Sequence, residues 1–346
     1  MSWIGPLMHL WEGYLSRRDL RRQALPFEWG LEWLDGQMPA DPPAERFFQY
    51  ARKALENSES FFTPGLEPSW EEEGAHWRFT TPLPSPYPAN NVARVKVWVS
   101  RSNGLPLSPA VVVVPQWNAD AGSHVGLCRA LAAAGMTAFR LTLPYHEERR
   151  VDGLERAEYL VSPNLGRTLQ AARQAVCEVR ALVRRLADLG IRRIGIVGSS
   201  LGSCVAYLAF AHEPLLQTGV FNHVAASFAD VVWRGEATRY VRKGLESHID
   251  LETLRRCWGP LSPWYFIPRV CRSGRNHLLI SARYDTTFLP ELAAPVYARY
   301  REQGGAYECR TLPCGHYTTA RWPFKYLDGW YIVNFLRRNL VRGKDA

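Results

Sequence analysis

The chain has 346 residues, 47% of them hydrophobic and 22% charged, with a formal net charge of +9. This apolar share is ordinary for a globular protein, and the length suits two average domains or one α/β core with insertions. No segment reaches the roughly 18 consecutive apolar residues of a membrane span, which argues against stable membrane insertion.

The basic residues do not form one continuous run. Arg173, Arg180 and Arg184 share one face of a predicted helix, which favours a solvated basic surface over nucleic-acid binding. Seven cysteines without any C-x-x-C pair argue against a disulfide framework or a zinc site. Residues 1–15 lack the basic and apolar regions of a secretory signal, so we expect a cytoplasmic protein.

The first part of the chain, residues 1–74, has helix-like patterns at 8–23 and 43–58 and predicts an N-terminal helical extension. Residues 75–346 then form the second predicted unit. It opens with two strand patterns, 76–81 and 92–100, in which apolar and polar residues alternate.

Strand and helix patterns alternate through the rest of the chain. Helices are predicted near 123–134, 169–190, 290–301 and 324–338, and strands at 111–114, 137–143, 192–197, 224–228, 277–282 and 307–312. The aromatic-rich stretch 231–274 is helical in pattern and predicts a lid insertion. We therefore expect an α/β fold, a mostly parallel sheet with helices on both faces.

The most informative motif follows the strand predicted at 192–197. Gly198-Ser199-Ser200-Leu201-Gly202 is a G-x-S-x-G sequence that runs into a helical pattern. A serine at so sharp a strand-to-helix turn needs small neighbours, and its hydroxyl stands exposed at a helix N-terminus. The motif indicates Ser200 as a nucleophile, with a glycine-rich structural turn as the alternative.

A serine nucleophile needs a base, and the base needs an orienting acid. His316 comes just after the strand at 307–312, and Asp285 just after the strand at 277–282. Both therefore belong at the carboxyl edge of a parallel sheet, where functional groups gather. Asp230 is the substitute acid, and a purely structural loop histidine is the alternative for His316.

The chain order Ser200, Asp285, His316 resembles that of the α/β-hydrolase superfamily, over roughly residues 76–340. The run Pro115-Gln116-Trp117-Asn118 and the turn 143–146 look most like its dienelactone-hydrolase and acetyl-esterase branch. The resemblance implies that Ser200 attacks a carbonyl carbon, His316 moves the proton and Asp285 orients the imidazole.

The same resemblance implies an oxyanion hole formed by the backbone N–H of Leu201 and by Trp117, with Gln116 as the fallback. The loop lacks the His-Gly-Gly-Gly sequence seen in many lipases. Substrate contacts are expected from four side chains of the loops and the lid, namely Asn118, His146, Trp258 and Trp264.

The predicted function is that of a serine hydrolase that cleaves carboxylic esters of a small or medium acyl group. It would use no metal or organic cofactor, and its partner would be a small-molecule ester, with homodimer formation left open. A peptidase, thioesterase or lactonase with the same triad is the alternative in chemistry. A non-catalytic binding protein of the same fold is the alternative in class.

Overall fold

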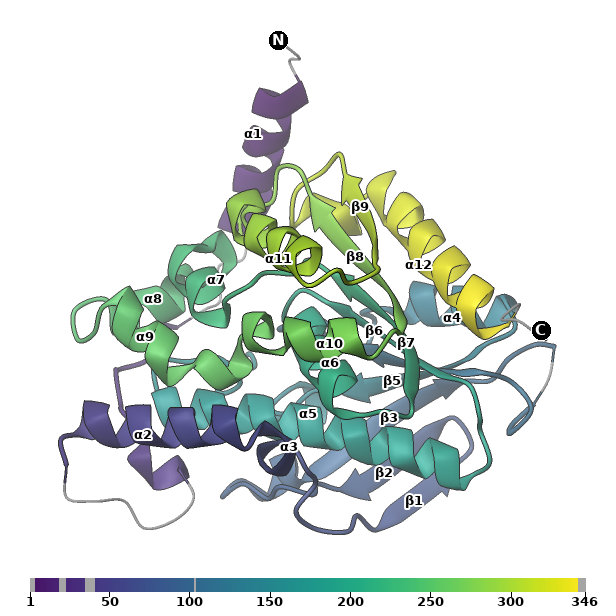
Figure 1. Ribbon diagram of the computed structural model, residues 1–346, viewed down its shortest axis with the longest axis horizontal. Coiled ribbons are helices and arrows are strands. Elements are labelled where there is room, and N and C mark those ends of the chain that lie inside the picture. Colours follow the sequence, from purple (N-terminus) through teal and green to yellow (C-terminus); the bar gives the residue numbers. More distant parts are fainter. Residues whose placement is uncertain (1–3, 19–22, 35–40, 103, 342–346) are drawn as a thin grey trace.

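The computed structural model describes residues 4–18, 23–34, 41–102 and 104–341. At its centre lies one nine-stranded sheet with the order β1-β2-β3-β5-β4-β6-β7-β8-β9, flanked by helices (Figure 1). The strands β5, β4, β6, β7, β8 and β9 are parallel to one another. The strands β1, β2 and β3 extend the sheet with antiparallel pairs. The predicted fold class is confirmed.

The antiparallel part comprises β1 (Trp70–Glu73), β2 (His76–Thr80) and β3 (Val92–Trp98). Burial along β3 alternates, with Val95 and Val97 facing the core as their spacing predicts. The edge strand β1 was not predicted, because its sequence, a tryptophan followed by three glutamates, has no apolar alternation.

The parallel strands are β4 (Ala110–Val114), β5 (Thr137–Thr142), β6 (Ile194–Ser199), β7 (Leu216–Asn222), β8 (Asn276–Ala282) and β9 (Glu308–Leu312). All five residues of β4 are buried, as its continuous apolar run indicates.

One predicted strand is wrong. Residues 224–228 form the loop after β7 and the start of helix α7 (Phe228–Arg234). The strand of this region is β7, which begins at Leu216, eight residues before the predicted start. The β7 sequence contains Gln217, Thr218 and Gly219, which interrupt its apolar run. Residues 224–228 are nearly all apolar because they are buried in the loop and at the start of the helix. A short apolar run of this kind does not distinguish a buried strand from a buried helical segment.

Helices cover both faces of the sheet. One face carries α4 (Val125–Ala133) and α12 (Phe324–Leu340), and the other carries α5 (Leu165–Asp188) and α6 (Leu201–His212) (Figure 1). The side chain of Asn164 caps α5 by accepting the backbone N–H of Arg167. A further helix, α11 (Pro290–Glu302), lies between β8 and β9 in the sequence.

The stretch predicted as a lid is helical. It contains α7, α8 (Arg239–Leu245), α9 (Leu251–Cys257) and α10 (Ile267–Arg272), with short 3₁₀ turns between them. Its residue Trp258 is fully buried and donates its indole N–H to the carbonyl of Leu165 in α5, so the segment shares the core of the sheet domain.

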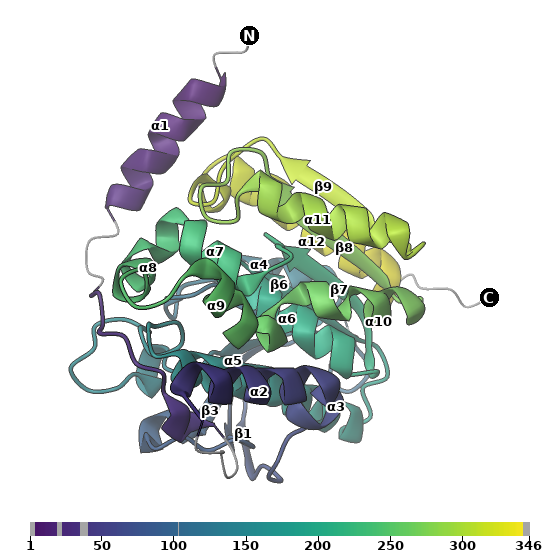
Figure 2. The same ribbon diagram turned by 60° about the vertical axis from the view of Figure 1, so that its left-hand side comes forward.

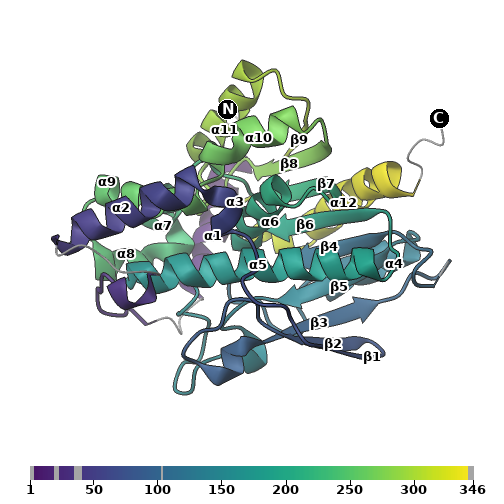
Figure 3. The same cartoon turned by 60° about the horizontal axis from the view of Figure 1, so that its bottom comes forward.

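The N-terminal part contributes α1 (Ile4–Arg17), α2 (Pro43–Glu56) and α3 (Ser58–Phe61). Figure 3 shows α2 beside α5, and the amide of Gln170 in α5 donates to the hydroxyl of Tyr50 in α2. The helix predicted at 8–23 begins earlier, at Ile4, and ends at Arg17; residues 19–22 lie outside the described residues. None of the helices in the described part of the chain is long and apolar enough to cross a membrane.

Candidate active site

The turn between β6 and α6 holds Ser200 in a strained backbone conformation, with φ 54° and ψ −125°. The two motif glycines make this turn sterically feasible. A Cβ on Gly198 would lie 2.1 Å from the carbonyl oxygen of Gly202, and a Cβ on Gly202 would lie 2.3 Å from the carbonyl oxygen of Pro115. The backbone N–H of Ser200 donates to the carbonyl of Asn222, which ties the turn to β7.

Three side chains distant in sequence meet at the carboxyl edge of the sheet. The Oγ of Ser200 lies 3.1 Å from Nε2 of His316, and Nδ1 of His316 lies 3.2 Å from Oδ2 of Asp285. The base follows β9 and the acid follows β8, as their places in the sequence predict. The arrangement is that of a nucleophile, a general base and an orienting carboxylate within hydrogen-bond reach.

The acid of this triad is completely enclosed. Oδ1 of Asp285 accepts the backbone N–H groups of Thr287 and Phe288, at 2.8 and 2.7 Å. Burial by itself raises the pKa of Asp285, but the neighbouring His316 and His223 and their hydrogen bonds hold this pKa well below its usual range. The carboxyl is therefore ionised at neutral pH and stabilises a protonated imidazole.

The structure adds a second histidine to the acid, which the sequence reasoning missed. Nδ1 of His223 lies 2.7 Å from Oδ2 of Asp285, closer than Nδ1 of His316. His223 directly follows β7, so the rule that located His316 and Asp285 also applies to it. The strand predicted at 224–228 begins after this residue, so the sequence pattern does not place His223 at the end of a strand.

The base is also held by ring packing. The imidazole of His316 stacks on Phe288 with ring planes 7° apart and centroids 5.6 Å apart. Phe288 lies in the loop after β8, three residues beyond Asp285. The same loop therefore fixes the imidazole both by a hydrogen bond and by a ring contact.

The predicted oxyanion residues follow two neighbouring strands, β6 and β4. Leu201 is the first residue of α6, where backbone N–H groups have no partner within the helix. After β4, the backbone N–H of Asn118 is already donated to Nε2 of His146 at 2.8 Å. This leaves Gln116 and Trp117 as the predicted second donors.

Two of the four predicted substrate contacts have other roles in the structure. His146 is buried, and its two ring nitrogens bond to the backbone of Asn118 and Pro144, so it positions the loop after β4. Trp258 has no exposed surface left for a substrate. The half-buried Trp264 has the Arg299 guanidinium 5.0 Å from its ring centroid.

The substitute acid, Asp230, is not at a strand end. It lies in α7 and accepts two hydrogen bonds from the guanidinium of Arg255, at 2.6 and 2.9 Å. These bonds account for both of its oxygens. The structure thus favours Asp285, and not Asp230, as the partner of His316.

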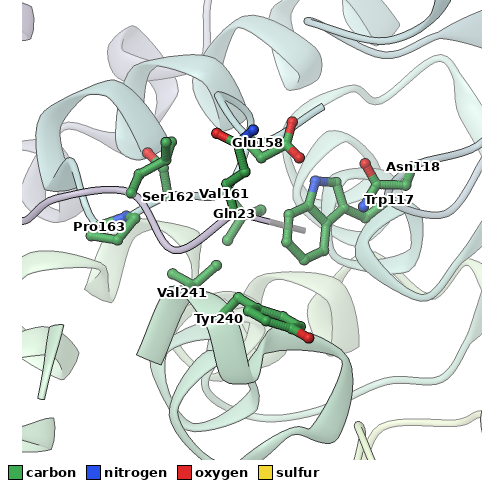
Figure 4. A pocket seen from close by; sticks show the side chains of 10 residues that line it. Gln23, Trp117, Asn118, Glu158, Val161, Ser162, Pro163, Tyr240 and Val241 are labelled. Atoms are coloured by element: carbon green, nitrogen blue, oxygen red, sulfur yellow. The ribbon is translucent and has the colours of Figure 1, made fainter. Parts of the chain in front are cut away.

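A pocket adjoins the loop after β4. Trp117 and Asn118 line one side of it, and Tyr240 and Val241 of α8 line the other (Figure 4). The indole N–H of Trp117 donates to the carbonyl of Ala157 at 2.9 Å, which fixes the ring in the pocket wall. This pocket brings residues of the predicted lid next to the predicted oxyanion loop.

Only one set of described residues has potential metal ligands close together. These are His223, Asp285 and His316, whose ligand atoms lie within 4.8 Å of one another. The same atoms form the two histidine–carboxylate hydrogen bonds, so the triad itself explains why they are close. The buried polar groups here thus have a role that does not require an ion.

The ionisation of buried histidines predicts how stability depends on pH. Burial lowers the pKa of His124, His146, His212 and His277 to about 4. In the unfolded chain each returns to about 6.5, so between these pH values the unfolded state binds more protons. The free energy of unfolding should therefore fall as the pH drops from about 6.5 to about 4, by at most about 3 kcal/mol per histidine.

Urea unfolding at pH 7, 5.5 and 4.5 measures this loss. Asp328 acts in the opposite direction, because burial raises its pKa to about 6 and the native state then holds an extra proton. One such group offsets only part of the effect of the four histidines. The variant His277→Gln should show a shallower loss, and an unfolding free energy that is constant over this range would contradict the prediction.

Solved structures with the same architecture include esterases and peptidases. The Pyrococcus horikoshii acylaminoacyl peptidase is 14% identical with a TM-score of 0.60, and the match covers 81% of this chain and 43% of that chain. Acetyl xylan esterase 1 from Thermoanaerobacterium sp. JW/SL YS485 is 16% identical with a TM-score of 0.57, and the match covers 90% of this chain and 99% of that chain. The acetyl xylan esterase from Paenibacillus sp. R4 is 14% identical with a TM-score of 0.56, and the match covers 88% of this chain and 98% of that chain.

These likenesses establish the fold. The chain has the α/β-hydrolase fold, as its motif order predicts. It spans less than half the length of the acylaminoacyl peptidases that it matches and nearly the whole length of the acetyl xylan esterases. No protein-family model and no curated protein matches its sequence.

Proposed function

We propose that this protein is a serine hydrolase that cleaves carboxylic esters of small or medium acyl groups through an acyl-enzyme intermediate. The observation that carries the proposal is the continuous hydrogen-bonded path from the Ser200 hydroxyl through His316 to the buried Asp285 carboxylate. Such a path has a chemical use, since it removes a proton from a hydroxyl as that oxygen bonds to carbon.

The reaction begins when Oγ of Ser200 attacks the ester carbonyl and Nε2 of His316 takes its proton. The negative charge that develops on the carbonyl oxygen is stabilised by the N–H of Leu201 and by one N–H from Gln116 or Trp117. His316 then returns the proton to the leaving alcohol. Water repeats the two steps on the acyl-enzyme and releases the acid.

A fluorophosphonate probe tests this proposal directly. It should label the parent protein covalently and should not label Ser200→Ala, because the phosphonyl bond forms with Oγ. The single missing oxygen leaves the fold unaltered, and circular dichroism serves as the control. Equal labelling of both proteins would remove Ser200 as the nucleophile, and no labelling of the folded parent would favour a binding protein of this fold.

The ester preference is tested with p-nitrophenyl esters of rising acyl length, compared with acyl-aminoacyl p-nitroanilides. We propose that the acyl group enters the pocket between Trp117 and Tyr240, and because this pocket is small we expect the short esters to be the better substrates. A higher kcat/KM for the anilides would instead identify a peptidase with the same triad. The acetyl xylan esterases and the acylaminoacyl peptidase among the structural neighbours are consistent with either outcome.

A further inference from the structure

The N-terminal helix α1 projects from the body of the protein (Figure 2). Leu7 and Leu10 on its outer side are more than 60% exposed. On its inner side Met8 and Ser16 are buried, and between them lies Glu12, which has no exposed surface at all. A carboxylate is costly to bury unless hydrogen bonds replace its water, so its partners indicate its role.

The partners of Glu12 are the backbone N–H groups that directly follow the catalytic base. Its two oxygens accept from Tyr317, at 3.0 Å, and from Thr318, at 2.7 Å. Thr318 begins the 3₁₀ turn η7 (Thr318–Ala320), where the first N–H groups lack partners within the turn. Glu12 therefore caps this turn although it lies 306 positions before Thr318 in the sequence.

The residue before the base leaves space for this carboxylate. A Cβ on Gly315 would lie 2.3 Å from Cδ of Glu12 and 2.6 Å from its Oε1, closer than non-bonded atoms approach. Gly315 is not in a left-handed conformation, so the backbone itself would accept an alanine there. A side chain at this position would therefore clash with Glu12 as the carboxylate is placed here.

We propose that Glu12 is a positioning residue for His316, so that the N-terminal helix forms part of the catalytic apparatus. On one side of the base, Asp285 holds the imidazole; on the other side, Glu12 holds the backbone of Tyr317 and Thr318. The loop that carries His316 is thus fixed by two elements far apart in the chain, α1 and the loop after β8. This inference rests on the serine-hydrolase function proposed above.

The first test is Glu12→Gln in the full-length protein. The side chain keeps its size, but one accepting oxygen becomes an NH₂ group that faces a backbone N–H. We expect kcat and the rate of fluorophosphonate labelling to fall about tenfold to a hundredfold while KM stays unchanged, because a small displacement of a catalytic group has effects of this size. The amide protons of Tyr317 and Thr318 should exchange faster. Leu10→Ala, on the exposed face of the same helix, is the matched control and should match the parent.

The second test uses the contact between Glu12 and Gly315. Gly315→Ala in the parent should displace the carboxylate and slow labelling as Glu12→Gln does. In a Glu12→Ala background the space is free, so the same substitution should have little additional effect. Such non-additivity is expected of residues in direct contact and not of independent structural damage.

The outcomes separate this inference from the proposed function. If the parent is not labelled, the proposed function fails and the inference fails with it. If the parent is labelled and Glu12→Gln reacts at the same rate, only the inference is overturned. Equal losses from Gly315→Ala in both backgrounds would also overturn it, since the added methyl would then act on something other than Glu12.

Discussion

Replacing Asp285 with asparagine is expected to lower kcat by about four powers of ten while the protein remains folded. The carboxylate accepts hydrogen bonds from Nδ1 of both His316 and His223, through the same oxygen. An amide NH₂ at this place would favour imidazole tautomers with unprotonated Nδ1, and Nε2 of His316 could then not accept the serine proton. The loss should appear equally in p-nitrophenyl ester turnover and in the rate of fluorophosphonate labelling.

The matched control is Asp230→Asn, which changes a carboxylate of similar type outside the triad. It removes the ion pair with Arg255, whose side chain is 46% exposed, and such pairs contribute little. Activity should stay within about threefold of the parent. A large loss in Asp230→Asn combined with an active Asp285→Asn would show that the acid has been assigned wrongly.

The largest expected effect on stability comes from Glu178→Leu. Arg149 and Glu178 form a two-bond ion pair, at 2.6 and 2.8 Å, in which neither side chain is exposed. Without the carboxylate the guanidinium is left charged and buried, and breaking a buried pair in this way costs about 3–5 kcal/mol. Urea unfolding at pH 7 measures the change in the free energy of unfolding.

The double variant Arg149→Met/Glu178→Leu should recover part of this loss, because it leaves no unpaired charge. Recovery should be incomplete, since Arg149 also donates to the carbonyls of Asn90 and Thr142. Glu246→Ala, in an exposed pair with Arg242, is the control and should change the unfolding free energy by less than about 0.5 kcal/mol. A cost below about 1 kcal/mol for Glu178→Leu would contradict the prediction.

Local patterns explain how much of the fold and the triad was predictable. The run in β4 and the G-x-S-x-G turn each report on their immediate surroundings, burial on both faces in one case and a tight bend in the other. Asp285 and His316 were found because each directly follows a strand whose pattern is regular. The topology then brings the ends of β6, β8 and β9 to one edge of the sheet.

The features that were missed depend on contacts between distant segments. His223 needed the correct end of β7, whose interrupted apolar run hid the strand. Glu12 has no local signal, since a single glutamate in an apolar helix shows nothing of the backbone that it meets. The burial of Trp258 likewise depends on α5 packing against it, whereas its aromatic neighbours suggested a separate lid.

The place of Glu12 affects how a shortened version of this protein should be made. A boundary at residue 74, drawn from the change in sequence pattern, leaves every member of the triad in the retained fragment. It nevertheless discards the acceptor for the two amides beside His316, and it uncovers the side chains of α5 and α9 against which α2 packs. Expression fragments and N-terminal fusions should therefore keep the first helix intact and free to dock.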